Sequence, residues 1–142
     1  MGVVELGARP VTTTVLGRRY VCVLCGCVML VVPRELAARR RYSLTTIALA
    51  LARFAVGVTA TSIRGAVAPG TTFEEGWPTL RRWCAAVREG RLLQWIRGVS
   101  ELAGRALAER VSAVLAEASG VDARSASFEQ RVWQGAFSSP AP

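Results

Sequence analysis

Residues 43–57 read SLTTIALALARFAVG, and this stretch predicts the first helix of a mainly helical protein. Ser43 is a good N-cap residue, because its hydroxyl can accept a hydrogen bond from a free amide of the first turn. Apolar residues then recur at the spacing that places them on one helix face. They are Leu44, Ile47, Ala48, Leu51 and Phe54. Gly57 follows the pattern and supplies a stop.

Two shorter helical patterns follow. Thr59 or Thr61 can cap a helix that places Ile63 and Val67 on one side. After the break PGTTFEEG, a further helix is expected to begin near Pro78, a residue suited to the first helical turn. The buried stripe predicted for this helix consists of Leu80, Trp83, Cys84 and Val87.

The remainder of the chain predicts one long amphipathic helix over residues 91–120 and a partly ordered tail over residues 121–142. An apolar stripe continues through residues 91–120, and charges of alternating sign lie four residues apart on the opposite side. Gly98 and Gly104 weaken this pattern and can kink the helix. We expect the helix to fold back on the three before it or to pair with a second copy.

Positive charge is concentrated in the first two thirds of the chain. The formal net charge is +8, and the chain up to Arg91 holds 13 Arg against 5 Glu, whereas the rest is neutral. Every one of the 18 basic residues is arginine. This surplus predicts a polyanionic partner such as a phosphate backbone. The guanidinium fork also suits bidentate contact with phosphate or guanine.

The residue types that are missing argue against catalysis. The chain has no histidine, so it offers no His general base and no Ser/His or Cys/His nucleophile pair. Asp122 is the only aspartate, and the glutamates are scattered rather than grouped as a metal-dependent nuclease requires. No phosphate-binding loop or dinucleotide glycine fingerprint is present. We therefore predict that the protein is not an enzyme.

The three helices predicted within residues 42–90 have the ingredients of a helix-turn-helix unit, in which two helices support a third that enters the major groove. Arg81 and Arg82 would read base edges, and the other arginines would contact phosphates. The predicted DNA contacts are Arg39, Arg40, Arg41, Arg64, Thr79, Arg81, Arg82, Ala85 and Arg88. One feature fits poorly, because the connection from Pro69 to Trp77 is longer than the usual three or four residues. On the alternative interpretation, the arginines only solvate the surface.

The N-terminal segment, residues 1–33, is predicted to be a short β segment or a degenerate zinc ribbon. Residues 20–32 read YVCVLCGCVMLVV, in which Cys22 and Cys25 have the spacing of a zinc knuckle. A tetrahedral site needs about four ligands, and no cysteine precedes Cys22, so the other ligands would come from elsewhere, for example from a second chain. Without metal, the run would be a buried strand with inert thiols. Cys84 is expected to be a small core residue.

An export signal is a third interpretation of this run. Two arginines precede an apolar stretch of signal-peptide length, as in a twin-arginine signal. The charged cluster RELAARRR follows at once and opposes translocation. The apolar run is also too short to cross a bilayer as a helix.

The order of these features resembles a group of small bacterial proteins of unknown function. These proteins pair an N-terminal zinc ribbon with a transposase-like helix-turn-helix. The resemblance covers roughly residues 18–90: Cys22 and Cys25 match the second knuckle, Pro33 and residues 39–43 match the linker, and residues 76–83 match the entry to the recognition helix. The first knuckle is missing. The resemblance implies a DNA-binding module related to mobile-element proteins, without their catalytic domain.

Together these observations predict a cytoplasmic, non-catalytic protein that reads double-stranded DNA. No cofactor is predicted, although zinc could bind through Cys22 and Cys25 at an incomplete site. A homodimer could form through residues 91–118, and no membrane partner is expected. The alternative is a helical protein–protein interaction module, or a truncated relic, without DNA binding.

Overall fold

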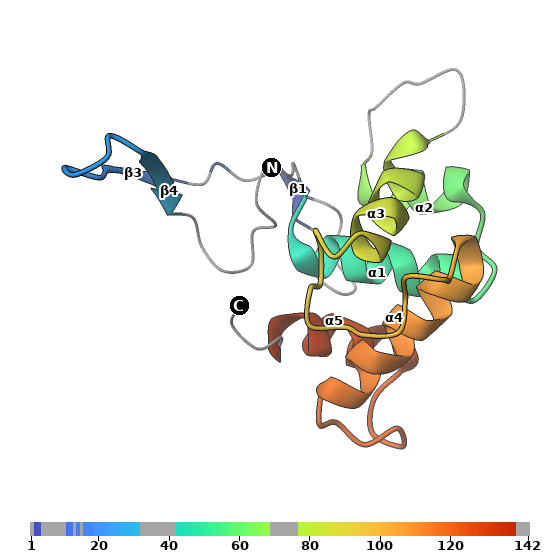
Figure 1. The fold of residues 1–142 in the computed structure, drawn as a ribbon. Coiled ribbons are helices and arrows are strands. Elements are labelled where there is room, and N and C mark those ends of the chain that lie inside the picture. Colours follow the sequence, from blue (N-terminus) through green and yellow to red (C-terminus); the bar gives the residue numbers. More distant parts are fainter. Residues whose placement is uncertain are drawn as a thin grey trace.

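The computed structural model of the protein describes residues 2–3, 11–12, 14, 16–31, 42–68 and 77–138. These residues form a mainly helical structure with short N-terminal strands, as predicted (Figure 1). The helices are α1 (Leu44–Ala55), α2 (Ala60–Val67), α3 (Pro78–Arg88), α4 (Gly104–Ala118) and α5 (Phe128–Ser138). The strands are β1 (Gly2–Val3), β2 (Val11–Thr12), β3 (Arg18–Val21) and β4 (Val28–Val31).

Helix α1 is the central element of the helical body. It contacts each of the other four helices, and most extensively α4 and α5. Its Ile47, Ala50 and Leu51 have no exposed surface. Alanine alternates with larger residues along this helix, so neighbouring helices can approach it on several sides. The helix is therefore the axis around which the core is built.

Local signals set the ends of α1 and α2 as predicted. The Ser43 hydroxyl accepts a hydrogen bond from the Thr46 amide at 3.1 Å, and Gly57 follows α1 with a φ of 94°. Of the two candidate caps for α2, the structure uses Thr59, whose hydroxyl accepts from the Ser62 amide at 3.3 Å.

Tryptophan packing anchors α3. The helix begins at Pro78, and Trp83 is almost fully buried. The rings of Tyr42 and Trp77 meet the Trp83 ring edge-on, at centroid distances of 5.2 and 5.1 Å. The predicted inner stripe of α3 is confirmed, because its four members are all buried.

The long helix predicted over residues 91–120 is wrong in its first half. Residues 91–103 form an irregular segment, and α4 begins only at Gly104. Leu93, Gly98 and Gly104 have φ values of 52°, 71° and 55°. Left-handed residues interrupt a right-handed helix, so Leu93 and Gly98 break the predicted helix rather than kink it, and Gly104 marks the start of α4. The apolar residues of this segment, Leu92 and Ile96 among them, are nevertheless buried in the core.

Helices α4 and α5 fold back on α1 and close the core. The apolar face of α4, with Leu107, Val111 and Leu115, is buried within the chain, so a second copy would have to use another surface. The tail predicted to be partly ordered contains α5, whose Gly135 lies directly against the backbone of Leu115.

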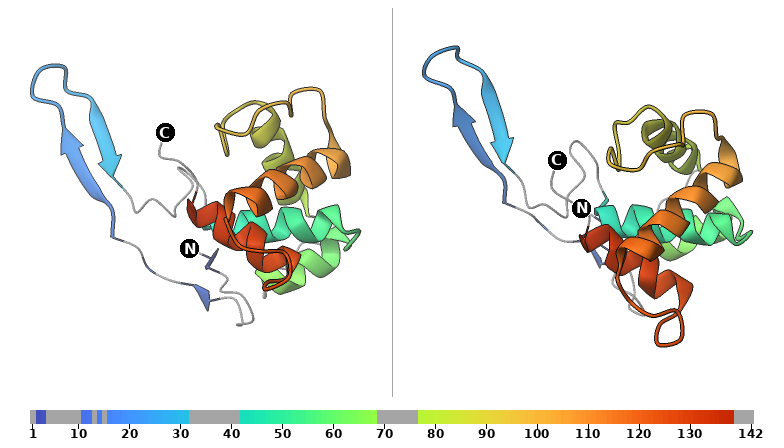
Figure 2. Two further views of the ribbon diagram at one scale, coloured as in Figure 1. Left: turned by 90° about the horizontal axis from the view of Figure 1, so that it is seen from below. Right: turned by 60° about the horizontal axis from the view of Figure 1, so that its bottom comes forward.

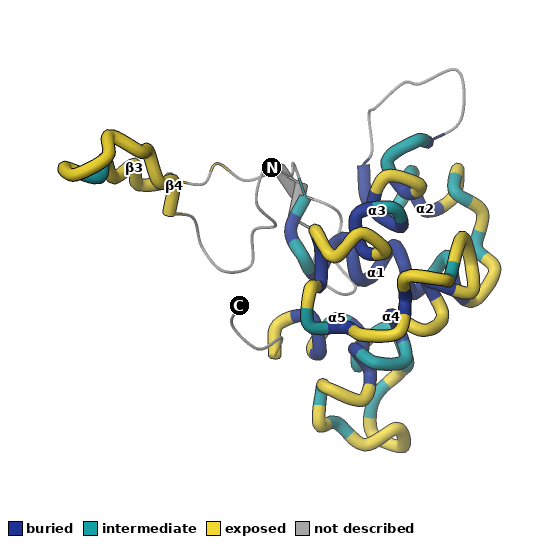
Figure 3. Tube along the Cα trace, viewed as in Figure 1, coloured by how far each residue is buried: buried dark blue, intermediate teal, exposed yellow. Residues whose placement is uncertain are grey.

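The apolar run that includes the cysteines is an exposed hairpin. Strands β3 and β4 are antiparallel, with Val21 paired with Val28. They lie apart from the helices in Figures 1 and 2 and are exposed along their length in Figure 3. The expectation of a buried strand is therefore wrong. The turn folds the run back on itself, and the described residues provide no second layer against which the two four-residue strands could pack.

No helix in the described part of the chain combines the length and the apolar character that a membrane span requires.

Candidate nucleic-acid interface

Helix α3 presents three arginines to solvent. Arg81, Arg82 and Arg88 are exposed, while Leu80 and Trp83 hold the opposite side of the helix in the core. Helical residues that differ by three or four positions share a face. Burial of the Leu80 and Trp83 side of α3 therefore turns its arginine side toward solvent. The sequence therefore predicted correctly which side of this helix faces outward.

The charge on this outer side is uncompensated among the described residues. The ion pairs that those residues form engage Arg53 with Glu129, at 3.2 Å, and Arg91 with Glu89. Helix α3 contains no acidic residue, and its first turn lacks the acid that would complement the helix dipole. Within the described part of the chain, its arginines therefore have no carboxylate partner.

The other predicted DNA contacts are divided over the molecule. Thr79 and Ala85 are half-buried on α3, and Arg64 is half-buried on α2. Arg39, Arg40 and Arg41 lie outside the described residues. The structure thus brings the α3 residues together, and the phosphate contacts predicted at residues 39–41 lie outside the described residues.

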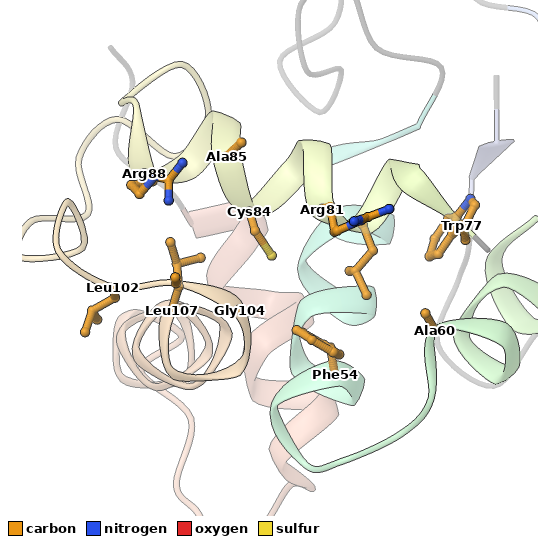
Figure 4. A pocket seen from close by; sticks show the side chains of 12 residues that line it. Phe54, Ala60, Trp77, Arg81, Cys84, Ala85, Arg88, Leu102, Gly104 and Leu107 are labelled. Carbon is orange, nitrogen blue, oxygen red and sulfur yellow. The ribbon is translucent and has the colours of Figure 1, made fainter. Parts of the chain in front are cut away.

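We call the surface formed by Arg81, Arg82 and Arg88 the arginine face. A groove of about 430 Å³ lies beside it (Figure 4). Arg81, Ala85 and Arg88 line it from α3, and Phe54 and Leu107 line it from α1 and α4. Arg82 does not line the groove. The arginine face therefore has two parts: Arg81 and Arg88 border the groove, and Arg82 lies on the open side, away from the groove.

The sequence did not reveal this groove. Apolar spacing places Phe54 and Leu107 on the stripes of two separate helices, and Leu102 falls within the helix predicted over residues 91–120, which in the structure begins only at Gly104. The groove joins α1, α3 and α4, which are far apart in the chain. No spacing within one segment indicates the groove. Arg105, on the polar side of the predicted last helix, has its guanidinium 5.6 Å from the centroid of the Phe54 ring, which lines the groove.

The hairpin places three thiols around one turn. The Cys22 amide donates to the Cys27 carbonyl, and the Gly26 amide donates to the Cys22 carbonyl, both at 2.9 Å. Gly26 has a φ of 70°, a value that glycine adopts without strain. Cys25 and Cys27 are exposed, so these thiols are not the inert core groups that the sequence suggested.

Hydrogen bonding lowers the pKa of the Cys25 thiol. The backbone of Cys27 makes the main contribution, followed by the side chains of Cys22 and Cys27. Such a thiol is an acceptable zinc ligand, but the described residues contain no group of three Cys, Asp or Glu side chains placed to hold a metal ion. One chain therefore does not complete a tetrahedral zinc site from its described residues.

Cys84 behaves differently from the hairpin thiols. It is 8% exposed, and burial raises the pKa of its thiol, with nearby Arg88 opposing this effect. The prediction that Cys84 is a core residue is confirmed. Cys84 lines the groove, and in Figure 4 its sulfur points away from α3, toward the side on which Phe54 lies.

Comparison with protein-family models, with curated proteins and with solved structures finds no match to this chain. The resemblance to zinc-ribbon and helix-turn-helix proteins therefore stays a prediction.

Proposed function

We propose that the protein binds double-stranded DNA without catalysing a reaction on it, and that α3 is the helix that enters the major groove. The observation that carries the proposal is the exposed arginine face of α3, anchored from behind by Trp83 and without a carboxylate partner among the described residues. Guanidinium groups on a short, rigidly held helix suit contact with guanine and phosphate.

Within this proposal, Arg82 reads bases and the surrounding arginines supply charge. Arg82 lies on the open side of the face, where the groove lining does not limit its reach. Contacts with phosphates add affinity that depends on salt but not on sequence. Sequence preference should therefore respond to Arg82 more than to arginines elsewhere.

The test is fluorescence anisotropy with duplexes selected from a random pool. Binding should weaken steeply with salt, because each neutralised phosphate releases counterions. Arg82→Ala should reduce the ratio of selected to random duplex affinity by about tenfold. Arg124→Ala is the matched control, since Arg124 is also exposed but lies in the turn before α5. It should leave that ratio unchanged.

If no duplex binds in a salt-dependent manner at low ionic strength, the proposal fails and a protein–protein interaction module is favoured. The exposed hairpin is the feature that would then matter most. Val23 and Leu24 at its tip are 97% and 94% exposed, and apolar surface of this kind is typical of interaction sites.

A further inference from the structure

The groove beside α3 has the size and composition of a small-molecule site. Its volume of about 430 Å³ falls within the range of pockets that bind drug-sized ligands. Leu80 and Leu107 contribute apolar side chains, Phe54 adds an aromatic ring, and Cys84 adds a buried sulfur. The floor of the groove is therefore suited to a hydrocarbon group.

All the formal charge that the described residues place around this floor is positive. Among those residues, Arg81 and Arg88 are the charged ones that line the groove, and no carboxylate lines it. They lie two helical turns apart on α3, with Cys84 between them in Figure 4. Arg105 adds a third guanidinium close by, over the Phe54 ring. A cationic ligand would be repelled at this rim, and an anionic group would be attracted.

We propose that this groove binds a small apolar carboxylic acid. The hydrocarbon part would lie on the floor formed by Phe54, Leu80 and Leu107. The carboxylate would accept hydrogen bonds from the guanidinium of Arg81 or Arg88, a geometry for which arginine is well suited. The floor favours an apolar body and the rim favours a single anionic group, so together they specify the ligand class.

The site stands independently of DNA binding, but the two share residues. Arg81 and Arg88 belong both to the groove and to the arginine face of α3. A carboxylate held there would neutralise part of the charge presented to a phosphate backbone. If the proposed DNA binding holds, the acid should therefore weaken it, and this consequence alone rests on the proposed function.

Decanoate, below the concentration at which it forms micelles, is a suitable probe for calorimetric titration of the full chain without DNA. We expect saturable binding of one molecule per chain. Decan-1-ol and decyltrimethylammonium carry the same hydrocarbon chain without the negative charge. Both should bind at least about tenfold more weakly, because they lack the charge-assisted hydrogen bonds.

Variants on one helix locate the site. The double variant Arg81→Gln/Arg88→Gln should weaken decanoate binding by about tenfold or more, whereas Arg82→Gln should not change it, since Arg82 lies on the same helix outside the groove. Circular dichroism and thermal unfolding check that the variants fold. A further readout needs no variant: decanoate should slow alkylation of Cys84, measured by mass spectrometry, and leave that of Cys25 unchanged.

Three results would overturn the proposal. They are equal binding of the three ten-carbon probes, unaltered binding by the double variant, or uptake of decanoate without saturation. The outcome is separable from that of the DNA experiment, because the titration contains no nucleic acid. A protein that binds decanoate but no duplex DNA would refute only the proposed function.

Discussion

At the scale of single residues, a glycine allows two helix backbones to meet. Gly135 on α5 touches the backbone of Leu115 on α4, and a Cβ added at Gly135 would overlap the Leu115 carbonyl. The missing side chain lets the two helices approach each other more closely than any other residue would permit. Ser43 and Gly57 have equally local roles, since they set the two ends of α1.

Gly135→Ala should lower the free energy of unfolding by about 2 kcal/mol or more, because α5 would have to move away from α4 and leave the core less well packed. Chemical denaturation followed by circular dichroism measures the change. Gly65→Ala is the matched control: Gly65 is an exposed helical glycine with open space where a methyl group would lie, so this variant should be neutral or more stable by about 0.5–1 kcal/mol. Equal effects of the two substitutions would contradict the close approach of α4 and α5.

At the scale of elements, the chain places its thiols in two contrasting environments. The hairpin turn exposes Cys25 and lowers the pKa of its thiol through hydrogen bonds, whereas α3 buries Cys84 and raises the pKa of its thiol by desolvation. The reactive species in alkylation is the thiolate. We therefore expect hydrogen bonding at Cys25 and burial at Cys84 to give the two thiols different reactivities.

Cys25 should react with iodoacetamide at a lower pH than Cys84. At neutral pH, the lowered pKa gives Cys25 a larger thiolate fraction, and the raised pKa gives Cys84 a smaller one. As the pH rises above the ordinary thiol range, Cys84 should also become ionised. The difference between the two alkylation rates should then narrow, and the part that remains is due to the restricted access of the reagent to buried Cys84. Peptide mass spectrometry as a function of pH and time follows both sites. Equal rates across the pH range would contradict these assignments.

At the scale of the whole molecule, stability resides in the helical body. The buried residues of the described chain lie in the segments 43–68 and 77–136, whereas β3 and β4 bury none of theirs. An isolated two-stranded hairpin contributes little to the burial that drives folding. Global unfolding should therefore report on the helical body, including the buried segment 91–103, and not on the hairpin.

A pair of valine substitutions tests this division. Val111→Ala should lower the free energy of unfolding by about 2–3 kcal/mol, because Val111 is fully buried on α4 and its loss leaves a cavity. Val28→Ala should change the free energy by less than about 0.5 kcal/mol, since Val28 on β4 is largely exposed. Thermal unfolding monitored by helical circular dichroism measures both. A comparable loss at Val28 would show that the hairpin is part of the cooperative unit.

Local sequence signals determined the three helices α1, α2 and α3 and their inner faces, because caps, helix-ending residues and apolar spacing act within a few turns of chain. The outward position of Arg81 and Arg82 follows from the same spacing. Only the tertiary structure decided the rest. The apolar residues after Arg91 are buried by a loop and not by a helix, because Leu93 and Gly98 adopt left-handed backbone conformations that interrupt a helix, and apolar spacing alone does not predict the conformation of Leu93. The groove exists because α1, α3 and α4 meet, and periodicity along one segment carries no information about such a meeting.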